Sequence, residues 1–236
     1  MRKITDRGAR AIACAVLTVS VFALAALTFG NARTVSLTGG DDYAPIYHGD
    51  RSKARVAFAI NVYENAEVVN KMLDLFTEKG VAATFFLGGC WADDNAETVR
   101  RIAECGMEIG NHGYFHKDCK KLDEDACFTE IKVCHDLVYS LCGSEPTLFA
   151  PPSGSYDDKT LRIAEKLGYK SIMWSKDTID WRDNDESVLF RRATEGFLNG
   201  DIILMHPKPH TLSALGGIID YYKEKNVEIV TVSDCL

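Results

Sequence analysis

The sequence lacks an excess of basic residues: 27 Lys and Arg stand against 34 Asp and Glu, which gives a formal net charge of −7. Binding to a phosphate backbone needs clustered positive charge, so this balance argues against a nucleic-acid partner. The sequence also has no internal repeat and no low-complexity tract. Its 236 residues are enough for one domain with a full hydrophobic core.

No two of the 8 cysteines are spaced as C-x-x-C, which argues against a zinc site built from cysteine. Cys14 falls in an apolar N-terminal stretch, and the others are odd in number, so at least one would be unpaired in a monomer. An exported protein would pair some of them in disulfides, whereas a protein that meets little oxygen would keep them reduced. The sequence leaves both alternatives open.

A stretch without any charged residue runs from Ala11 to Gly30, behind a basic flank at the N-terminus. Such a stretch can span a bilayer, and the basic flank should stay in the cytoplasm, so the rest of the chain is expected outside. We predict a single-pass protein of the cell membrane, with an anchor at 1–32, a linker at 33–54 and an extracytoplasmic domain at 55–236. Cleavage after Ala32 would make it a secreted protein instead.

Apolar runs of strand length alternate with segments of helical spacing after residue 55. The strands are expected at 55–61, 81–87, 108–110, 148–150, 170–174, 201–205 and 227–232. The helices are expected at 65–78, 96–104, 123–141, 157–167, 186–198 and 212–225. Repeated strand–helix units indicate a parallel sheet with crossover helices. We therefore predict an α/β fold with about seven parallel strands.

Polar residues follow the ends of these expected strands, where the active groups of parallel sheets gather. They are Asn61, His112, His116, Ser153, Asp177 and His206. The first two histidines of this set are four positions apart, and imidazoles at that spacing can bind one metal ion. The pattern predicts a metal site on one rim of the sheet.

The chain from about Arg55 onward resembles the polysaccharide deacetylase family with the NodB homology domain, similar to carbohydrate esterase family 4. The motifs that carry the resemblance are V-A-A-T-F-F-L-G-G at 81–89, N-H-G-Y-F-H at 111–116, F-A-P-P-S-G at 149–154, W-S-K-D-T-I-D-W at 174–181 and I-L-M-H at 203–206. The resemblance implies a distorted (β/α) barrel that removes N-acetyl groups from a polysaccharide with the help of a divalent metal. A domain held outside the membrane meets the cell wall first, so a polymer such as peptidoglycan is the expected substrate and partner.

The resemblance also implies roles for the rim residues. His112 and His116 would bind the metal, with zinc as the expected ion, and the metal would polarise the acetyl carbonyl and activate water. His206 would protonate the leaving amine as the general acid. Asp177 would orient this histidine and raise its pKa, and Asp180 is the second candidate for that task.

Two further residues would contact the substrate. Ser153 would offer its backbone N–H to the oxyanion, at a position where the family usually has Tyr. Trp181 would stack on a sugar ring if it stands at the rim, although a tryptophan in such a place is more often part of a core.

The first motif departs from the family pattern. The family ends its first strand with two aspartates, the catalytic base and the third metal ligand, where this chain has Asn61 and Val62. An amide cannot usefully accept a proton, and valine cannot bind a metal. The third motif also lacks its usual arginine, which positions the base and is replaced by Ala150. The two changes look like one adaptation.

Three hypotheses follow from this departure. Another carboxylate, Glu64 or Asp118, replaces the missing pair, or a weaker two-histidine site is completed by water or by the amide oxygen of Asn61. Alternatively, the domain is inactive and binds a glycan or acts as a scaffold. An amidase for a small acylated substrate is a further option. The retained histidines favour a hydrolase, and a carboxylate oxygen within ligand range of His112 and His116 would support it, whereas its absence would favour the binding domain.

Overall fold

A computed structural model of the chain describes residues 44–236. The anchor predicted at 1–32 and the linker up to residue 43 lie outside the described residues. Among the helices of the described part, none is long and apolar enough to cross a membrane.

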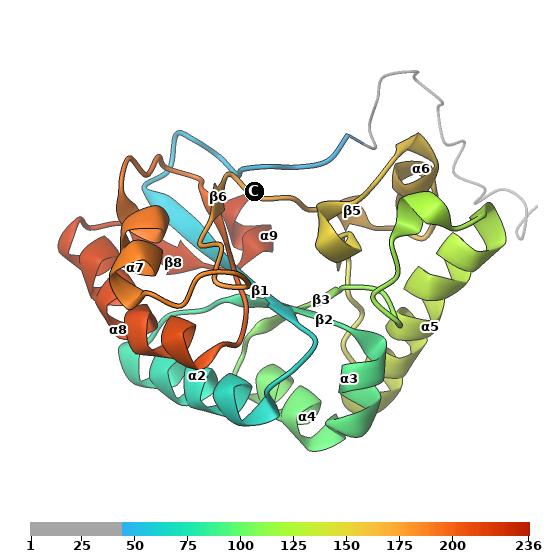
Figure 1. Cartoon of the computed structure of the whole chain (residues 1–236), viewed down its shortest axis with the longest axis horizontal. Helices are drawn as coiled ribbons and strands as arrows, with labels where there is room; N and C mark the ends of the chain where they lie inside the picture. The colour runs from blue at the N-terminus through green and yellow to red at the C-terminus, as the bar shows by residue number, and fades with distance from the viewer. Residues whose placement is uncertain (1–43) are drawn as a thin grey trace, which may run out of the picture. The chain divides into compact units, whose positions relative to one another are not determined.

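Within residues 44–236, eight strands form one curled sheet in which the paired strands are parallel (Figure 1). The strands are β1 (Arg55–Val62), β2 (Thr84–Leu87), β3 (Glu108–Asn111), β4 (Leu148–Phe149), β5 (Lys170–Ser171), β6 (Lys176–Asp177), β7 (Ile202–Met205) and β8 (Glu228–Val230). Their order is β5-β4-β3-β2-β1-β7-β6, and β8 pairs with the first residues of β1. Each of the seven predicted strands is present, and β6 is additional.

Helices connect these strands and surround the sheet (Figure 1). They are α2 (Ala66–Lys79), α3 (Gly89–Asp94), α4 (Ala96–Glu104), α5 (Glu124–Cys142), α6 (Asp158–Lys166), α7 (Glu186–Thr194), α8 (Pro209–Glu224) and α9 (Val232–Cys235), with short 3-10 helices η1 (Cys119–Lys121) and η2 (Pro152–Gly154). Helices α2 and α5 end where predicted, at Gly80 and Gly143, whose φ angles of 62° and 71° are the left-handed conformation that glycine adopts without strain.

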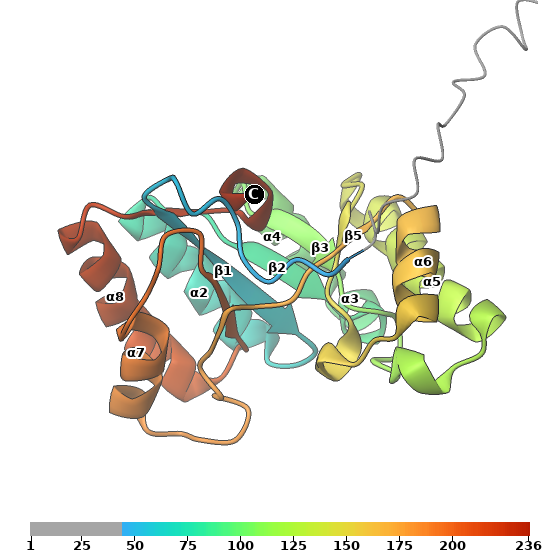
Figure 2. The ribbon, with the colours of Figure 1, turned by 90° about the horizontal axis from the view of Figure 1, so that it is seen from above.

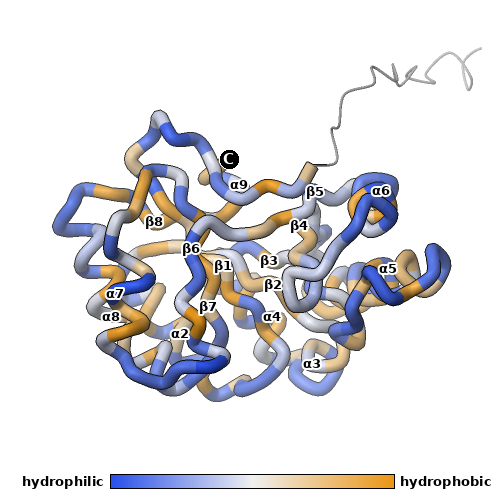
Figure 3. The backbone as a smooth tube through the Cα atoms, turned by 45° about the horizontal axis from the view of Figure 1, so that its top comes forward, coloured by the Kyte–Doolittle hydropathy of each residue, from blue (hydrophilic) through white to orange (hydrophobic). Residues whose placement is uncertain are grey.

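Side chains of β1 alternate between two environments. The even-numbered residues from Val56 to Val62 belong to the core between the sheet and the helices, whereas Ala57 and Ala59 belong to a second core on the other face of the sheet. Successive side chains of a strand point to opposite faces, so Asn61 falls on the side of the second core. Figure 3 shows the hydrophobic segments of β1, β4 and β7 in the middle of the domain.

One extended stretch, residues 170–177, belongs to both edges of the sheet. It begins as β5, which pairs with β4, and ends as β6, which pairs with β7, so the strand predicted at 170–174 is shorter than expected. The first described segment of the chain runs beside this stretch (Figure 2). In it, the Ile46 N–H donates to the Ser171 carbonyl (2.9 Å), and the Ile46 carbonyl accepts from the Met173 N–H (2.7 Å). Residues near Ile46, expected in the linker, therefore pack on the domain.

Each hydrophobic core contains a buried cysteine. Cys134 lies in the core between the sheet and the helices, and Cys235 lies in the core on the other face of the sheet. Cys119 and Cys127 lie in a third core beneath α5 and α6. The cysteines of the described residues are free thiols.

Candidate active site

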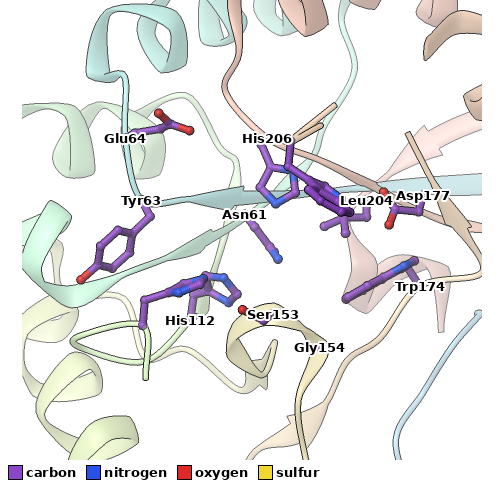
Figure 4. Close-up of a pocket in the computed structure, with 12 residues that line it drawn as sticks. Asn61, Tyr63, Glu64, His112, Ser153, Gly154, Trp174, Asp177, Leu204 and His206 are labelled. Atoms are coloured by element: carbon purple, nitrogen blue, oxygen red, sulfur yellow. The ribbon is translucent and has the colours of Figure 1, made fainter. Parts of the chain in front are cut away.

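A pocket of about 490 Å³ lies at the carboxyl ends of the strands (Figure 4). It is lined by Asn61, Tyr63, Glu64, His112, His116, Ser153, Gly154, Trp174, Asp177, Trp181, Leu204 and His206. Most residues proposed from the sequence as catalytic, substrate-binding or metal-binding are among them, because the parallel strands that precede them end on the same rim. Asp118 and Asp180, the two alternative carboxylates, do not line it.

The loop after β3, which carries His112 and His116, is held by buried polar groups. The side-chain oxygen of Asn111 accepts from the Gly113 N–H (2.8 Å). Glu130 of α5 is 4% exposed, and its carboxylate accepts from the backbone N–H groups of Phe115 (2.7 Å) and Lys117 (3.1 Å). Sequence reasoning missed Glu130, because an acidic residue in the middle of an amphipathic helix gives no sign of facing inward.

His112 is buried, and a backbone carbonyl fixes its ring. Nδ1 lies 2.8 Å from the Ala150 carbonyl, which can only accept, so Nδ1 carries the proton and Nε2 keeps its lone pair. Burial, and after it the nearby His116, lower the pKa of His112 to about 3. The two imidazole rings meet edge to face, with centroids 4.9 Å apart. At neutral pH the pocket therefore holds an uncharged His112 with one free nitrogen.

His206 forms a dyad with Asp180. Its Nδ1 donates to one carboxylate oxygen (2.7 Å), while the other oxygen accepts from the His206 backbone N–H and the Thr211 hydroxyl, both at 2.7 Å. Burial by itself raises the pKa of Asp180, but these hydrogen bonds and the His206 charge lower the pKa below its usual value. The geometry corrects the first choice of partner, because the Asp177 carboxylate accepts from the Ile179 N–H (2.7 Å) instead.

The third metal ligand expected from the sequence is not found beside the histidines. Among residues 44–236, no group of three His, Cys, Asp or Glu side chains is arranged to hold a metal ion. Glu64 is paired with the Lys208 ammonium, and Asp118 accepts from the Ser155 hydroxyl (2.6 Å). Val62 packs in the core beneath the helices. Two imidazoles do not match the three-ligand site that the family implies, and Glu64 does not complete it.

Asn61 brings an unpartnered acceptor to the pocket. It is 5% exposed at the end of β1, and its Oδ1 has no hydrogen-bond partner within the described residues. Figure 4 shows its side chain pointing into the pocket between His112 and His206, with the amide nitrogen at the visible tip. An unsatisfied buried acceptor costs about 1–3 kcal/mol, so a rotation of the amide that brings Oδ1 to a donor on a ligand would lower the free energy.

Aromatic rings line two sides of the pocket. Trp174 covers Gly154, where an added Cβ would lie 2.7 Å from the indole ring. Trp181 is 55% exposed, as a stacking platform needs to be, and Tyr63 lies on the opposite side from Trp174 (Figure 4). Ser153 adopts a φ angle of 56° within η2, which turns the chain at the edge of the pocket. Tyr63 was not expected from the sequence.

Comparison with known proteins identifies relatives of the chain. The family model for polysaccharide deacetylase matches residues 48–172. The uncharacterized protein YlxY of Bacillus subtilis is 38% identical over 192 residues, which is 81% of this chain and 60% of that protein. A peptidoglycan-N-acetylglucosamine deacetylase of Bacillus cereus is 31% identical over 197 residues, with 81% of this chain and 72% of that protein covered. The chain thus spans about three fifths of the Bacillus subtilis relative.

A similar solved structure is a CE4 family pseudoenzyme from Bacillus anthracis. It has a TM-score of 0.79 and 33% sequence identity, and the match covers 81% of this chain and 68% of that one. A mutant of the same pseudoenzyme with restored enzymatic activity also matches with a TM-score of 0.79.

Proposed function

The chain belongs to the polysaccharide deacetylase family, and on that premise we propose that its pocket binds an N-acetyl group of a cell-wall polysaccharide without hydrolysing it. The observation that carries this proposal is the buried, unpartnered amide oxygen of Asn61. An amide oxygen accepts a hydrogen bond from the N–H of an acetamido group, but it does not take a proton from water. The position therefore suits recognition better than catalysis.

The carboxylates that line or support the pocket are engaged elsewhere. Asp180 accepts hydrogen bonds on both oxygens, Glu64 is paired with Lys208, and Asp177 holds a backbone N–H of the following turn. A general base must reach the proton that it abstracts, within hydrogen-bond distance or through one water. Each of these carboxylates already accepts a hydrogen bond or pairs with a charge inside the protein. A water molecule would have to displace that partner before the carboxylate could act as a base, and this supports the proposal.

The proposed ligand is peptidoglycan, whose N-acetylated sugars carry the acetamido group that Asn61 would recognise. The substrate named for the Bacillus cereus relative supports this choice. The proposed location is the outer side of the cell membrane, with the apolar stretch Ala11–Gly30 as the anchor, or outside the cell if that stretch is removed.

Deacetylation is the second candidate function, and the complete His206–Asp180 dyad favours it. An imidazole held by a buried carboxylate is suited to protonate a leaving amine, a task that a binding domain does not require. In this alternative the enzyme is a metal-dependent N-deacetylase, and His112 and His116 would supply two of the ligands of a divalent ion such as zinc.

Two measurements on the full-length chain separate these functions. Calorimetric titration with an N-acetylglucosamine dimer should show binding, and the Asn61→Ala variant should bind roughly tenfold more weakly, because one hydrogen bond to a buried acceptor is lost. Acetate release from peptidoglycan and from N-acetylglucosamine oligomers, with zinc or cobalt added, should stay at background.

The controls decide between the alternatives. Acetate release by the wild-type chain that disappears in His112→Ala/His116→Ala would establish the deacetylase. Asn61→Asp restores a carboxylate at the end of β1, and if the missing base limits the reaction, this variant should release acetate faster than the wild type, by up to the about 10²–10⁴-fold that a general base contributes.

A further inference from the structure

Two tyrosines from distant parts of the chain meet at the surface. The hydroxyl groups of Tyr47 and Tyr156 lie 2.6 Å apart, although the residues are 109 positions apart in the sequence. Tyr47 is 43% exposed, so its ring is accessible to a ligand. Its position precedes the part of the chain that matches the family model, which begins at residue 48.

The pair lies next to the pocket. Tyr156 follows Gly154 by two positions, and Gly154 lines the pocket against the ring of Trp174. On the side of Tyr47, Ile46 pairs in parallel with Ile172, so Tyr47 lies opposite Met173. The Cε of Met173 would lie 3.2 Å from a Cβ added at Gly154. The segment that carries Tyr47 passes beside β5 in Figure 2. The tyrosines thus continue the side of the pocket that Trp174 and Gly154 form.

The chemistry of the pair suits an uncharged sugar. Exposed aromatic rings bind the apolar faces of pyranose rings, and the phenol hydroxyls accept or donate hydrogen bonds to sugar hydroxyls. A polysaccharide that places one sugar in the pocket must run on across the neighbouring surface. The Trp174 side offers it the two tyrosine rings.

We propose that Tyr47 and Tyr156 form a second subsite, which binds another sugar of the same glycan chain beyond the one held in the pocket. The proposal rests on the proposed binding of an N-acetylated polysaccharide. It assigns a ligand-binding task to Tyr47, in the segment ahead of the matched family domain.

The test compares a short and a long ligand by calorimetric titration of the full-length chain. The wild type should bind an N-acetylglucosamine hexamer more tightly than the dimer, because only the hexamer reaches the second subsite. Tyr47→Ala and Tyr156→Ala should each weaken hexamer binding about three- to tenfold and leave dimer binding unchanged. Tyr139→Ala is the matched control, because Tyr139 is 52% exposed on α5 and does not line the pocket.

A structural role for the pair gives a different result. If the pair only fastens the segment around Tyr47, then Tyr47→Ala weakens dimer and hexamer equally, and that outcome overturns the subsite. Hexamer binding no tighter than dimer binding, or equal hexamer affinities in the wild type and both variants, overturns it too. Binding of neither ligand by the wild type would refute the proposed function, and the subsite would fall with it.

Discussion

At the scale of the residue, Asp180 determines how the imidazole of His206 is held. Its carboxylate accepts three hydrogen bonds, two of them from His206. An asparagine would turn an N–H group toward one of these donors, and a buried donor left without an acceptor costs about 1–3 kcal/mol. We expect Asp180→Asn to lower the free energy of unfolding by this amount at pH 7, measured by urea denaturation.

The pH dependence of this loss has a defined sign. The pKa of Asp180 is lowered in the folded chain, so its stabilising effect is present above the unfolded pKa of about 3.9 and is lost as the pH falls through the lower folded value. The difference between the wild type and Asp180→Asn should shrink below about pH 4. Asp177→Asn is the control, since Asp177 holds one backbone N–H, and equal losses in both variants would argue against the dyad.

Sequence reasoning identified most of the polar residues of the pocket but not all of their partners. Asp177 and Asp180 are three positions apart in the same motif. The sequence does not show which of the two carboxylates contacts His206. The choice is made by a turn at Ile179, whose φ angle is 55°. The pairing of Glu64 with Lys208 joins residues 144 positions apart, so nothing near Glu64 in the sequence could announce it.

At the scale of the element, α5 supports the histidine loop through one side chain. We expect Glu130→Ala to leave the backbone N–H groups of Phe115 and Lys117 without their acceptor. Hydrogen bonds to a charged group contribute about 1.5–3 kcal/mol, so the two amides should exchange with solvent about tenfold faster or more. Hydrogen exchange followed by mass spectrometry measures this.

The control for this change lies on the same helix. Glu124 is exposed in the first turn of α5, and Glu124→Ala should leave the exchange of both loop amides unchanged. Unchanged exchange in Glu130→Ala as well would show that the loop keeps its conformation without the carboxylate.

Long helices were predictable, whereas some of the short elements were not. Helices such as α2 and α5 have apolar residues at helical spacing and a glycine at the end, so both period and boundary were readable. Strand β6 has two residues, too few to show any period. Helix α3 begins at Gly89, a residue that disfavours helices, and its existence depends on tertiary packing instead.

At the scale of the whole domain, residues near Ile46 help to close the curled sheet. We expect Ile46→Pro to lower the free energy of unfolding more than Ile46→Ala does, because proline also removes the N–H that donates to Ser171. The difference should be about 0.5–1.5 kcal/mol in urea denaturation. Equal losses in the two variants would show that only the side chain of Ile46 contributes.

The domain's architecture was readable from the alternation of strands and helices, whereas its closure was not. Parallel strand order follows from repeated crossover units. The pairing of Ile46 with residues 171 and 173 joins segments more than a hundred residues apart, and no local pattern marks such a contact. The family motifs begin after this segment, so the resemblance could not supply the contact either.

The buried thiols can serve as native probes of local unfolding in each hydrophobic core. A thiol reacts with an alkylating reagent only when it reaches solvent, and Cys134, Cys235 and the pair Cys119 and Cys127 each sit in a different core. Alkylation for increasing times in dilute urea, followed by peptide mapping, would therefore show the order in which the layers open. No cysteine has to be introduced by mutation, because the native chain already has a buried thiol in each of the three cores.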